Sequence, residues 1–366
     1  MGPAIHRATR SALRLSRVVV TAVAGLACTA GAPAKALPPL PALGIDIAQT
    51  STSGISSGAY MAGQFQMAHG EIVVGAAIIA GGPYGCAQSA VSAFSFGSWG
   101  TALNFNRAAN GCMLGLMRVF GVPSARVLVR RAERLAAAGE IAPLETIRRD
   151  RVYLFTGTKD VIVNPAIMQV TNRFYRALGV PAGQLAFEDS IPAGHAFVTE
   201  TEGGACGLSV SPFVVDCDFD LAGRLLAHIY GPLKPRGDLA NGRFVSFSQK
   251  PSVTGFRRHG LAAEGRAFIP DDCRRITGCR VHVAFHGCLQ NRAAAGDAFV
   301  GRTGLANWAV TNRIVVLFPQ TRASPDNPQG CWDWWGFTGR DFLTRKAPQI
   351  EAIHRMLQTL AAKPAK

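Results

Sequence analysis

The sequence predicts an α/β fold: a mostly parallel sheet with helices on both of its faces. Four mainly apolar segments have the length and composition of strands buried on both sides, at 72–80, 151–156, 281–285 and 314–318. Segments of helical character lie between these runs. Because strands that alternate with helices usually belong to βαβ units, the pattern indicates a mostly parallel sheet.

The first half of the sequence predicts a strand, a tight turn, a helix and a second strand, in this order. A candidate strand at 44–52 leads into the turn 54–58, and 59–69 has the composition of a helix, rich in Ala, Met and Gln. The next apolar run stops at Gly81-Gly82-Pro83, residues that end regular structure. Residues 85–150 are irregular and then helical in pattern, and we expect them to cover an edge of the sheet.

The second half continues the alternation. The strand 151–156 runs into Gly157-Thr158-Lys159-Asp160, and 165–178 is expected to be helical. A short strand at 184–187 precedes the loop Pro192-Ala193-Gly194-His195. A helical stretch separates the two late strands.

The first 36 residues are typical of an export signal. Four arginines and no acidic residue accompany an apolar segment from Val18 to Ala30, which is too short to span a bilayer comfortably. Residues 34–36 (AKA) place small side chains at the offsets that cleavage before Leu37 requires. An uncleaved membrane anchor and a lipid anchor at Cys28 are the alternatives. We therefore expect a signal peptide at 1–36, a periplasmic or extracellular protein, and no stable membrane insertion after cleavage.

The mature chain, 37–366, is expected to be a single catalytic domain. No Pro-, Ser- or Thr-rich linker interrupts it, so we expect no separate binding domain. Loss of the signal, with four Arg and one Lys, would lower the formal net charge from +15 to +10. The remaining basic residues are scattered apart from 126–151 and do not interleave with aromatic residues, so a nucleic-acid partner is not expected.

The cysteines indicate disulfides, because eight of the nine remain once Cys28 is removed with the signal. Short spacings favour two local bridges, and the other four cysteines give two further pairs. The expected pairs are Cys206–Cys217, Cys273–Cys279, Cys86–Cys112 and Cys288–Cys331. No CxxC or Cys/His spacing typical of zinc is present, and neither a metal nor another cofactor is expected.

Residues 54–58 (GISSG) fit the pattern G-x-S-x-G, a turn that exposes a serine hydroxyl between a strand and a helix. Glycine is required on both sides because a Cβ there would collide with neighbouring backbone. Here the motif follows a candidate strand and opens a helix, which is the context that the chemistry needs. Ser56 is the expected nucleophile; Ser53 and Ser57 are competitors, but only Ser56 has the two-residue spacing to both glycines.

A serine nucleophile needs a base, and the base needs a carboxylate that orients it. Asp160 stands at the carboxyl end of a buried strand, and His195 lies in a glycine-bearing loop 35 residues later. The order Ser, acid, His is that of α/β-hydrolases, so Asp160 and His195 are expected to complete the triad. Glu188 and Asp189 are alternatives for the acid, but neither ends a strong strand.

A tetrahedral intermediate also needs N–H donors for its oxyanion. One donor is expected from Ser57, the residue after the nucleophile. The loop with the second donor normally precedes the nucleophile, but here the matching segment, 286–290 (HGCLQ), lies far downstream. If this loop completes the site, the strands are circularly permuted. His286 is also a rival for the catalytic base, although its place beside Gly287 suits support of the loop better.

Five segments in this order resemble polyhydroxybutyrate (PHB) depolymerases of the type whose oxyanion loop lies C-terminal to the triad. The segments span nearly all of the mature chain: 54–62, 156–160, 193–197, 286–290 and 330–336. The resemblance implies a circularly permuted α/β-hydrolase fold without a metal, and hydrolysis of short-chain poly(3-hydroxyalkanoates) and their oligomers. By matching motifs it implies Ser56, Asp160 and His195 as the triad, with Ser57 and Cys288 as backbone oxyanion donors.

Trp332, Trp334 and Trp335 form the densest aromatic cluster in the sequence. On a strand, alternation would place Trp332 and Trp334 on one face. One interpretation is core packing; the other is a cleft wall that contacts the apolar face of a polyester. By resemblance, Trp332 is the expected substrate contact and Asn327 a second candidate.

Two other functions fit parts of the pattern. The loop His-Gly-Cys-x-Gln also occurs in feruloyl and acetylxylan esterases, where it usually precedes the nucleophile. A non-catalytic polymer-binding protein on this fold would be expected to have lost a member of the triad, and all three are present. We therefore expect a polyester and its oligomers as partners of a monomeric enzyme.

Overall fold

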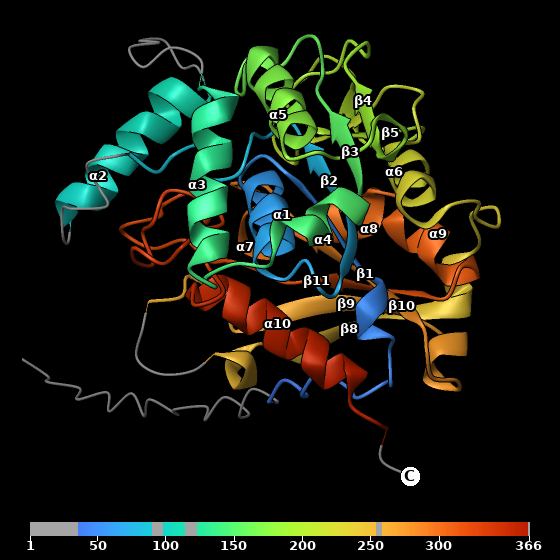
Figure 1. Ribbon diagram of the computed structural model, residues 1–366. Helices are drawn as coiled ribbons and strands as arrows, with labels where there is room; N and C mark the ends of the chain where they lie inside the picture. The colour runs from blue at the N-terminus through green and yellow to red at the C-terminus, as the bar shows by residue number, and fades with distance from the viewer. Residues whose placement is uncertain (1–35, 90–97, 114–122, 254–257, 365–366) are drawn as a thin grey trace, which may run out of the picture. The chain divides into compact units, whose positions relative to one another are not determined.

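The strand that leads to the serine turn lies in the middle of the main sheet. The computed structural model describes residues 36–89, 98–113, 123–253 and 258–364. Within them, β1 (Thr50–Ile55) belongs to an eight-stranded sheet with the order β4-β3-β2-β1-β10-β11-β9-β8 (Figure 1). On one side of β1 the sheet continues with three parallel strands, β2 (Val73–Ile79), β3 (Arg151–Phe155) and β4 (Leu185–Glu188).

The other side of β1 is built from the last third of the chain. β10 (Arg280–Phe285) pairs with β1, and β11 (Ile314–Phe318) pairs with β10, both in parallel. An antiparallel pair, β9 (Glu264–Pro270) and β8 (Gly242–Ser248), completes this edge. The first strand of the chain thus lies beside one of the last, which confirms the permuted, mostly parallel sheet that the sequence predicts.

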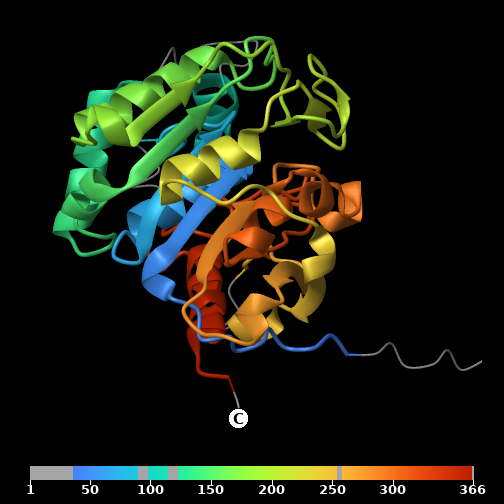
Figure 2. The ribbon, with the colours of Figure 1, turned by 90° about the vertical axis from the view of Figure 1, so that its right-hand side faces the viewer.

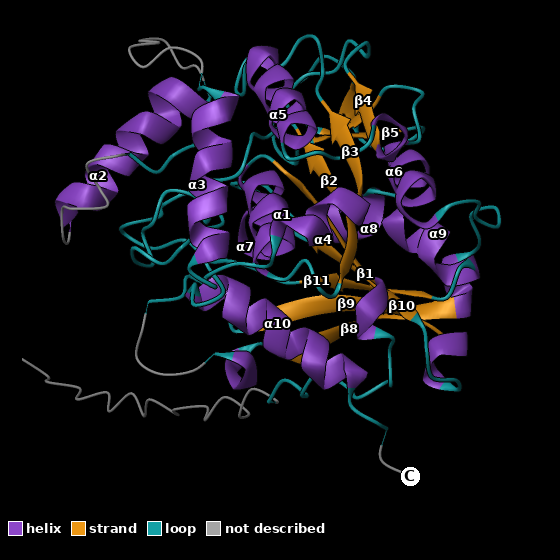
Figure 3. Cartoon of the chain, viewed as in Figure 1, coloured by secondary structure: helices purple, strands orange, loops and turns teal. Residues whose placement is uncertain are grey.

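Helices cover both faces of the sheet (Figures 2 and 3). Alternate residues of the strands enter two different cores: in β3, Val152 and Leu154 face one core, and Tyr153 and Phe155 face the other. The first core lies beneath α1 (Ser57–Ala68), α3 (Ala125–Ala137), α4 (Leu144–Arg149), α5 (Pro165–Ala177) and α10 (Pro348–Ala361). The second lies beneath α6 (Leu221–Tyr230), α8 (Ala298–Arg302) and α9 (Leu305–Thr311).

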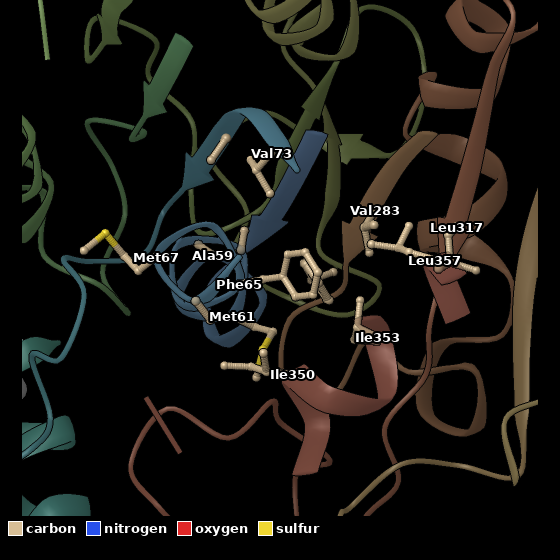
Figure 4. Packing of buried hydrophobic residues seen from close by; sticks show 14 of the residues in the cluster. Ala59, Met61, Phe65, Met67, Val73, Val283, Leu317, Ile350, Ile353 and Leu357 are labelled. Atoms are coloured by element: carbon tan, nitrogen blue, oxygen red, sulfur yellow. The ribbon is translucent and has the colours of Figure 1, made fainter. Parts of the chain in front are cut away.

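The first core fixes the helix that begins at the serine turn. Every residue of α1 is buried, so this helix is held on all sides. Figure 4 shows Phe65 of α1 among side chains of α10 and of the strands, including Ile353 and Val283. A helix that is buried on all sides is typical of a central position in a large domain.

Several elements differ from the expectation. The expected strand at 44–52 begins only at Thr50, because Asp46 caps a short 3₁₀ turn, Ile47–Gln49, by accepting a hydrogen bond from the N–H of Ala48. Residues 85–150 were expected at an edge of the sheet; instead α3 and α4 pack on one face, beside α5 and α1, and the edge strands are β4 and β8.

Strands β8 and β9 and helix α6 are absent from the sequence-based expectation. β8 is mostly half-buried at an edge of the sheet, so its sequence lacks the long apolar run of a central strand. A second, three-stranded parallel sheet was also unexpected, since its strands have only two or three residues: β5 (Phe197–Thr199), β6 (Gly204–Ala205) and β7 (Val214–Asp216).

Residues 37–366 form one compact unit by themselves. Residues 1–35 lie outside the described part of the chain, so the signal peptide stays a prediction. Among the helices that the structure describes, none has the length and hydropathy needed to cross a bilayer.

Four disulfides join the cysteines in the pairs predicted from the sequence. Cys86–Cys112 and Cys288–Cys331 close loops of 26 and 43 residues, and Cys206–Cys217 and Cys273–Cys279 close shorter ones. Such bridges stabilise a fold mainly by restricting the unfolded chain.

We predict that the protein cleaved before Leu37 contains no free thiol. Mass spectrometry of a non-reducing digest should recover the four linked peptide pairs. Reduction should lower the melting temperature, because each bridge typically contributes about 2–4 kcal/mol to the free energy of unfolding. Two or more free cysteines in the folded protein would contradict the four-bridge arrangement.

Candidate active site

The turn between β1 and α1 holds Ser56 in a conformation that few residues adopt. Its backbone has φ 57° and ψ −122°, a strained combination for a residue with a Cβ. Every other residue from Thr50 to Gly70 is buried, whereas Ser56 is partly exposed. The strain therefore lifts one serine out of an otherwise buried segment, as a nucleophile requires.

Both glycines of the motif are required by close backbone contacts. A Cβ on Gly54 would lie 2.1 Å from the carbonyl oxygen of Gly58. A Cβ on Gly58 would lie 2.2 Å from the carbonyl oxygen of Phe285 and 2.4 Å from that of His286. The serine turn is thus pressed against the end of β10, where the segment 286–290 begins.

Asp160 and His195, the predicted acid and base, form a hydrogen-bonded pair. The Nδ1 atom of His195 lies 2.8 Å from Oδ2 of Asp160, and both side chains are buried. The other carboxylate oxygen of Asp160 accepts hydrogen bonds from the backbone N–H groups of Ile162 and Val163, 2.9 Å each. With Nδ1 directed at the carboxylate, Nε2 is the ring nitrogen left to exchange a proton with a substrate or a nucleophile.

The loops that carry this pair are fastened to each other. Lys159 donates its backbone N–H to the carbonyl of Ala193, and a Cβ on Gly157 would lie 2.1 Å from the same oxygen. The backbone N–H of His195 donates to Oγ of Ser209 at 2.7 Å. The glycine-bearing segments therefore allow the two loops to approach closely enough for the side chains to meet.

His286, the rival for the base, supports the loop instead. It is fully buried, its Nδ1 lies 2.7 Å from the carbonyl oxygen of Gly287, and its Nε2 accepts from the N–H of Thr321 at 3.2 Å. Burial lowers the pKa of His286 to about 4, which keeps the ring neutral. Both ring nitrogens are thus engaged by backbone groups.

A second serine–histidine cluster lies inside the sheet. The ring nitrogens of His282 on β10 lie 2.6 Å from Oγ of Ser51 and 2.7 Å from Oγ of Ser53, both on β1. All three residues are fully buried, and burial lowers the pKa of His282 to about 3. Ser53, a competitor for the nucleophile, is therefore out of reach of any substrate. This cluster was not predicted from the sequence, although the i, i+2 serines place both hydroxyls on one face of a strand.

The candidate oxyanion donors flank Ser56. Ser57 is the first residue of α1, where backbone N–H groups have no partner within the helix. In the loop after β10, Gly287 donates its N–H to Oε1 of Gln290, and Leu289 donates to the carbonyl of Gln329. Between Gly287 and Leu289, the backbone N–H of Cys288 donates to no protein group in the part of the chain that the structure describes. A Cβ on Gly287 would lie 3.3 Å from Cβ of Ser56, which places this loop beside the serine.

The two predicted substrate contacts are buried. Trp332 is fully buried and packs edge-on against Phe285, with ring centroids 4.9 Å apart. Its backbone N–H donates to Oγ of Ser57 at 3.3 Å. Asn327 bonds both the N–H and the carbonyl of Cys331 through its side-chain amide. Both residues therefore hold the segment beside the serine turn.

The other two tryptophans of the segment 330–336 belong to a third apolar cluster. The segment 330–336 is a loop and not a strand, so the expected alternation does not apply. Trp334 stacks on Tyr60 of α1 with ring centroids 4.1 Å apart, and Trp335 contacts Trp334 and Phe337. Core packing thus accounts for Trp334 and Trp335.

Within the described residues, no group of three or more His, Cys, Asp or Glu side chains is placed to hold a metal ion.

We predict that Gly58→Ala destabilises the protein and lowers its activity. The new methyl group would push the turn away from the carbonyls of Phe285 and His286, at a cost of about 2–3 kcal/mol in the free energy of unfolding. Gly63→Ala, on the same helix, is the control, because its Cβ would meet only side-chain atoms 3.5 Å away or farther. Urea unfolding of both variants gives the comparison; equal stabilities would contradict the close approach.

The chain is similar to known depolymerases in both sequence and fold. No family model matches the chain. It is 36% identical over 328 residues to a poly(3-hydroxybutyrate) depolymerase of Delftia acidovorans, covering 88% of this chain and 62% of that protein's length. It is 32% identical over 344 residues to a polyhydroxybutyrate depolymerase of Talaromyces funiculosus, covering 88% of this chain and 92% of that protein.

Two solved structures share the fold, each with a TM-score of 0.77 and 28% identity over 88% of this chain and 98% of the other. One is a PHB depolymerase from Penicillium funiculosum, and the other is a serine-to-alanine variant of a PHB depolymerase complexed with an R3HB trimer. These likenesses favour the depolymerase interpretation over the feruloyl or acetylxylan esterase. The predicted fold class is confirmed, and the chain belongs to the polyhydroxybutyrate depolymerase family.

Proposed function

We propose that this protein hydrolyses the ester bonds of poly(3-hydroxybutyrate), of related short-chain polyhydroxyalkanoates and of their oligomers. The observation that carries the proposal is the contact between the strained turn at Ser56 and the loop after β10. This contact brings a nucleophile beside backbone donors on the scaffold of a depolymerase family. The hydrogen-bonded pair of Asp160 and His195 supplies the acid–base groups.

In the proposed reaction, Oγ of Ser56 attacks the ester carbonyl carbon while Nε2 of His195 takes the hydroxyl proton. Asp160 holds Nδ1–H and stabilises the imidazolium that forms. The carbonyl oxygen, now negative, accepts hydrogen bonds from the N–H groups of Ser57 and Cys288. Collapse of the intermediate breaks the ester C–O bond, and His195 returns the proton to the departing alcohol. Water then attacks the acyl-enzyme by the same route and releases the hydroxy acid.

Trp332 and Asn327 are proposed to shape the place where the polyester enters. The indole N–H of Trp332 is buried without a hydrogen-bond partner in the described part of the chain. An ester carbonyl of the bound polymer would supply the missing acceptor. Asn327 would act by holding Cys331, the neighbour of Trp332.

The disulfides and the depolymerase relatives support an exported protein. We infer that the predicted signal at 1–36 directs this export, to the periplasm or the medium, and that 37–366 acts as a single catalytic domain and as a monomer. The family supports a polyester and its oligomers as its binding partners.

We predict that Ser56→Ala lowers kcat on amorphous PHB and on p-nitrophenyl butyrate by several orders of magnitude, while the fold is kept. Ser53→Ala is the control; it should lose stability through His282 but keep kcat, because Ser53 is sealed inside the sheet. Near-normal turnover by folded Ser56→Ala would overturn the assignment. Release of ferulate from arabinoxylan, with no 3-hydroxybutyrate from PHB, would overturn the proposed substrate.

We predict that replacing both Cys288 and Cys331 by Ala harms stability more than catalysis. The proposed donor at position 288 is the backbone N–H, which alanine keeps, whereas loss of the bridge removes about 2–4 kcal/mol of stability. Melting curves and kcat on p-nitrophenyl butyrate at 15 °C would be measured together. A fully folded double variant whose kcat has fallen as far as that of Ser56→Ala would show that the sulfur is required for catalysis.

A further inference from the structure

Gln290 ends the loop after β10, and the mechanism above gives it no part. Its side chain is 2% exposed, and its amide makes three hydrogen bonds. Oε1 accepts from the N–H of Gly287 at 2.7 Å, while Nε2 donates to the carbonyls of Pro212 and Phe213, 3.0 Å each. One buried side chain therefore joins two segments that are distant in the sequence.

The first segment is the backbone of the proposed oxyanion hole. Gln290 occupies the N–H of Gly287, so this group is not free to bind an oxyanion. The carbonyl of Gly287 is held as well, by Nδ1 of His286 at 2.7 Å and by the backbone N–H of Gln290 at 3.2 Å. In a trans peptide the N–H of the next residue points opposite to that carbonyl. Fixing Gly287 at both ends therefore sets the direction of the Cys288 N–H.

The second segment supports the proposed base. The carbonyl of Phe213 also accepts from the N–H of Phe197, and the ring of Phe213 contacts the ring of His195 edge-on, with centroids 6.4 Å apart. Ser209, a few residues earlier, receives the backbone N–H of His195. The two bonds from Nε2 of Gln290 thus tie the oxyanion loop to the strand and loop that hold the imidazole.

We propose that Gln290 is a positioning residue. It directs the backbone N–H of Cys288 at the reacting carbonyl and fixes the position of this N–H relative to the imidazole of His195. The inference rests on the proposed function. A primary amide suits this place because it accepts one hydrogen bond and donates two. Glutamate would set a carboxylate against two carbonyl oxygens, and methionine would make none of the three bonds.

A second buried glutamine provides a matched control. Gln249 is fully buried, its Nε2 donates to the carbonyls of Ala262 and Gln320 at 2.8 Å each, and its Oε1 accepts from the N–H of Gln320 at 3.0 Å. It makes the same set of bonds directly after β8, and its printed partners include neither Gly287 nor residues 212–213. Gln249→Met and Gln290→Met therefore lose equivalent interactions, and only the second removes the hydrogen bond to Gly287.

The experiment compares the two variants in urea unfolding and in kcat and KM on p-nitrophenyl butyrate. Both should lose similar stability. Gln290→Met should lose about a hundredfold in kcat, the loss typical of a missing oxyanion donor, with KM little changed. Gln249→Met should keep kcat within about threefold of the wild type. Inhibition by a phosphonate that mimics the tetrahedral intermediate should weaken in parallel with kcat in Gln290→Met alone.

Three outcomes would overturn the inference: an unchanged kcat in Gln290→Met, an equal loss in Gln249→Met, or a change confined to KM. An inactive wild-type protein, or an active Ser56→Ala variant, would instead refute the proposed function. If Gln290→Met does not fold, Gln290→Glu replaces it, because glutamate keeps the acceptor for the N–H of Gly287. Gln249→Glu is then the control, and the same contrast in kcat is expected.

Discussion

The close backbone approach between the serine turn and the end of β10 is the constraint on which the site depends. Side chains are excluded at Gly54 and Gly58 because carbonyl oxygens already lie where a Cβ would be. This contact leaves Ser56 as the partly exposed residue of a buried segment and sets the loop of Gly287 against it. The strain at Ser56 persists because β1, α1 and β10 hold it from three directions.

The interior of the sheet keeps this approach in register. Ser51 pairs with His282 and Gly54 with Phe285 along β1 and β10. The imidazole of His282 binds two serines of β1, so a slip by one residue would bury hydroxyls without a partner. The polar cluster thus gives the two central strands a specificity that apolar side chains alone would not provide.

The sequence predicted the central strands and the short disulfides from local signals, and it selected Asp160 and His195, whose side chains the structure joins by a hydrogen bond. Strands buried on both faces are continuous apolar runs, and the motif glycines mark close backbone contacts. The edge strand β8 and the short strands of the second sheet lacked such a signal, since half-buried or three-residue strands look like loops. The sequence left open whether Trp332 is buried or lines a cleft, because the answer follows from the tertiary position of the segment 330–336.

The permuted order of the strands has a consequence for biosynthesis. Ser56 lies near the start of the folded domain, whereas Cys288 and its bridge to Cys331 come more than two hundred residues later. A chain that leaves the ribosome or the export channel from its N-terminus can pair β1 with β2 early but must wait for β10 to complete the sheet. The contact that creates the site is thus among the most non-local in the fold, and closing it is intrinsically slow. While the chain is being made, Ser56 is therefore present before the loop that carries Cys288, so the proposed site is incomplete.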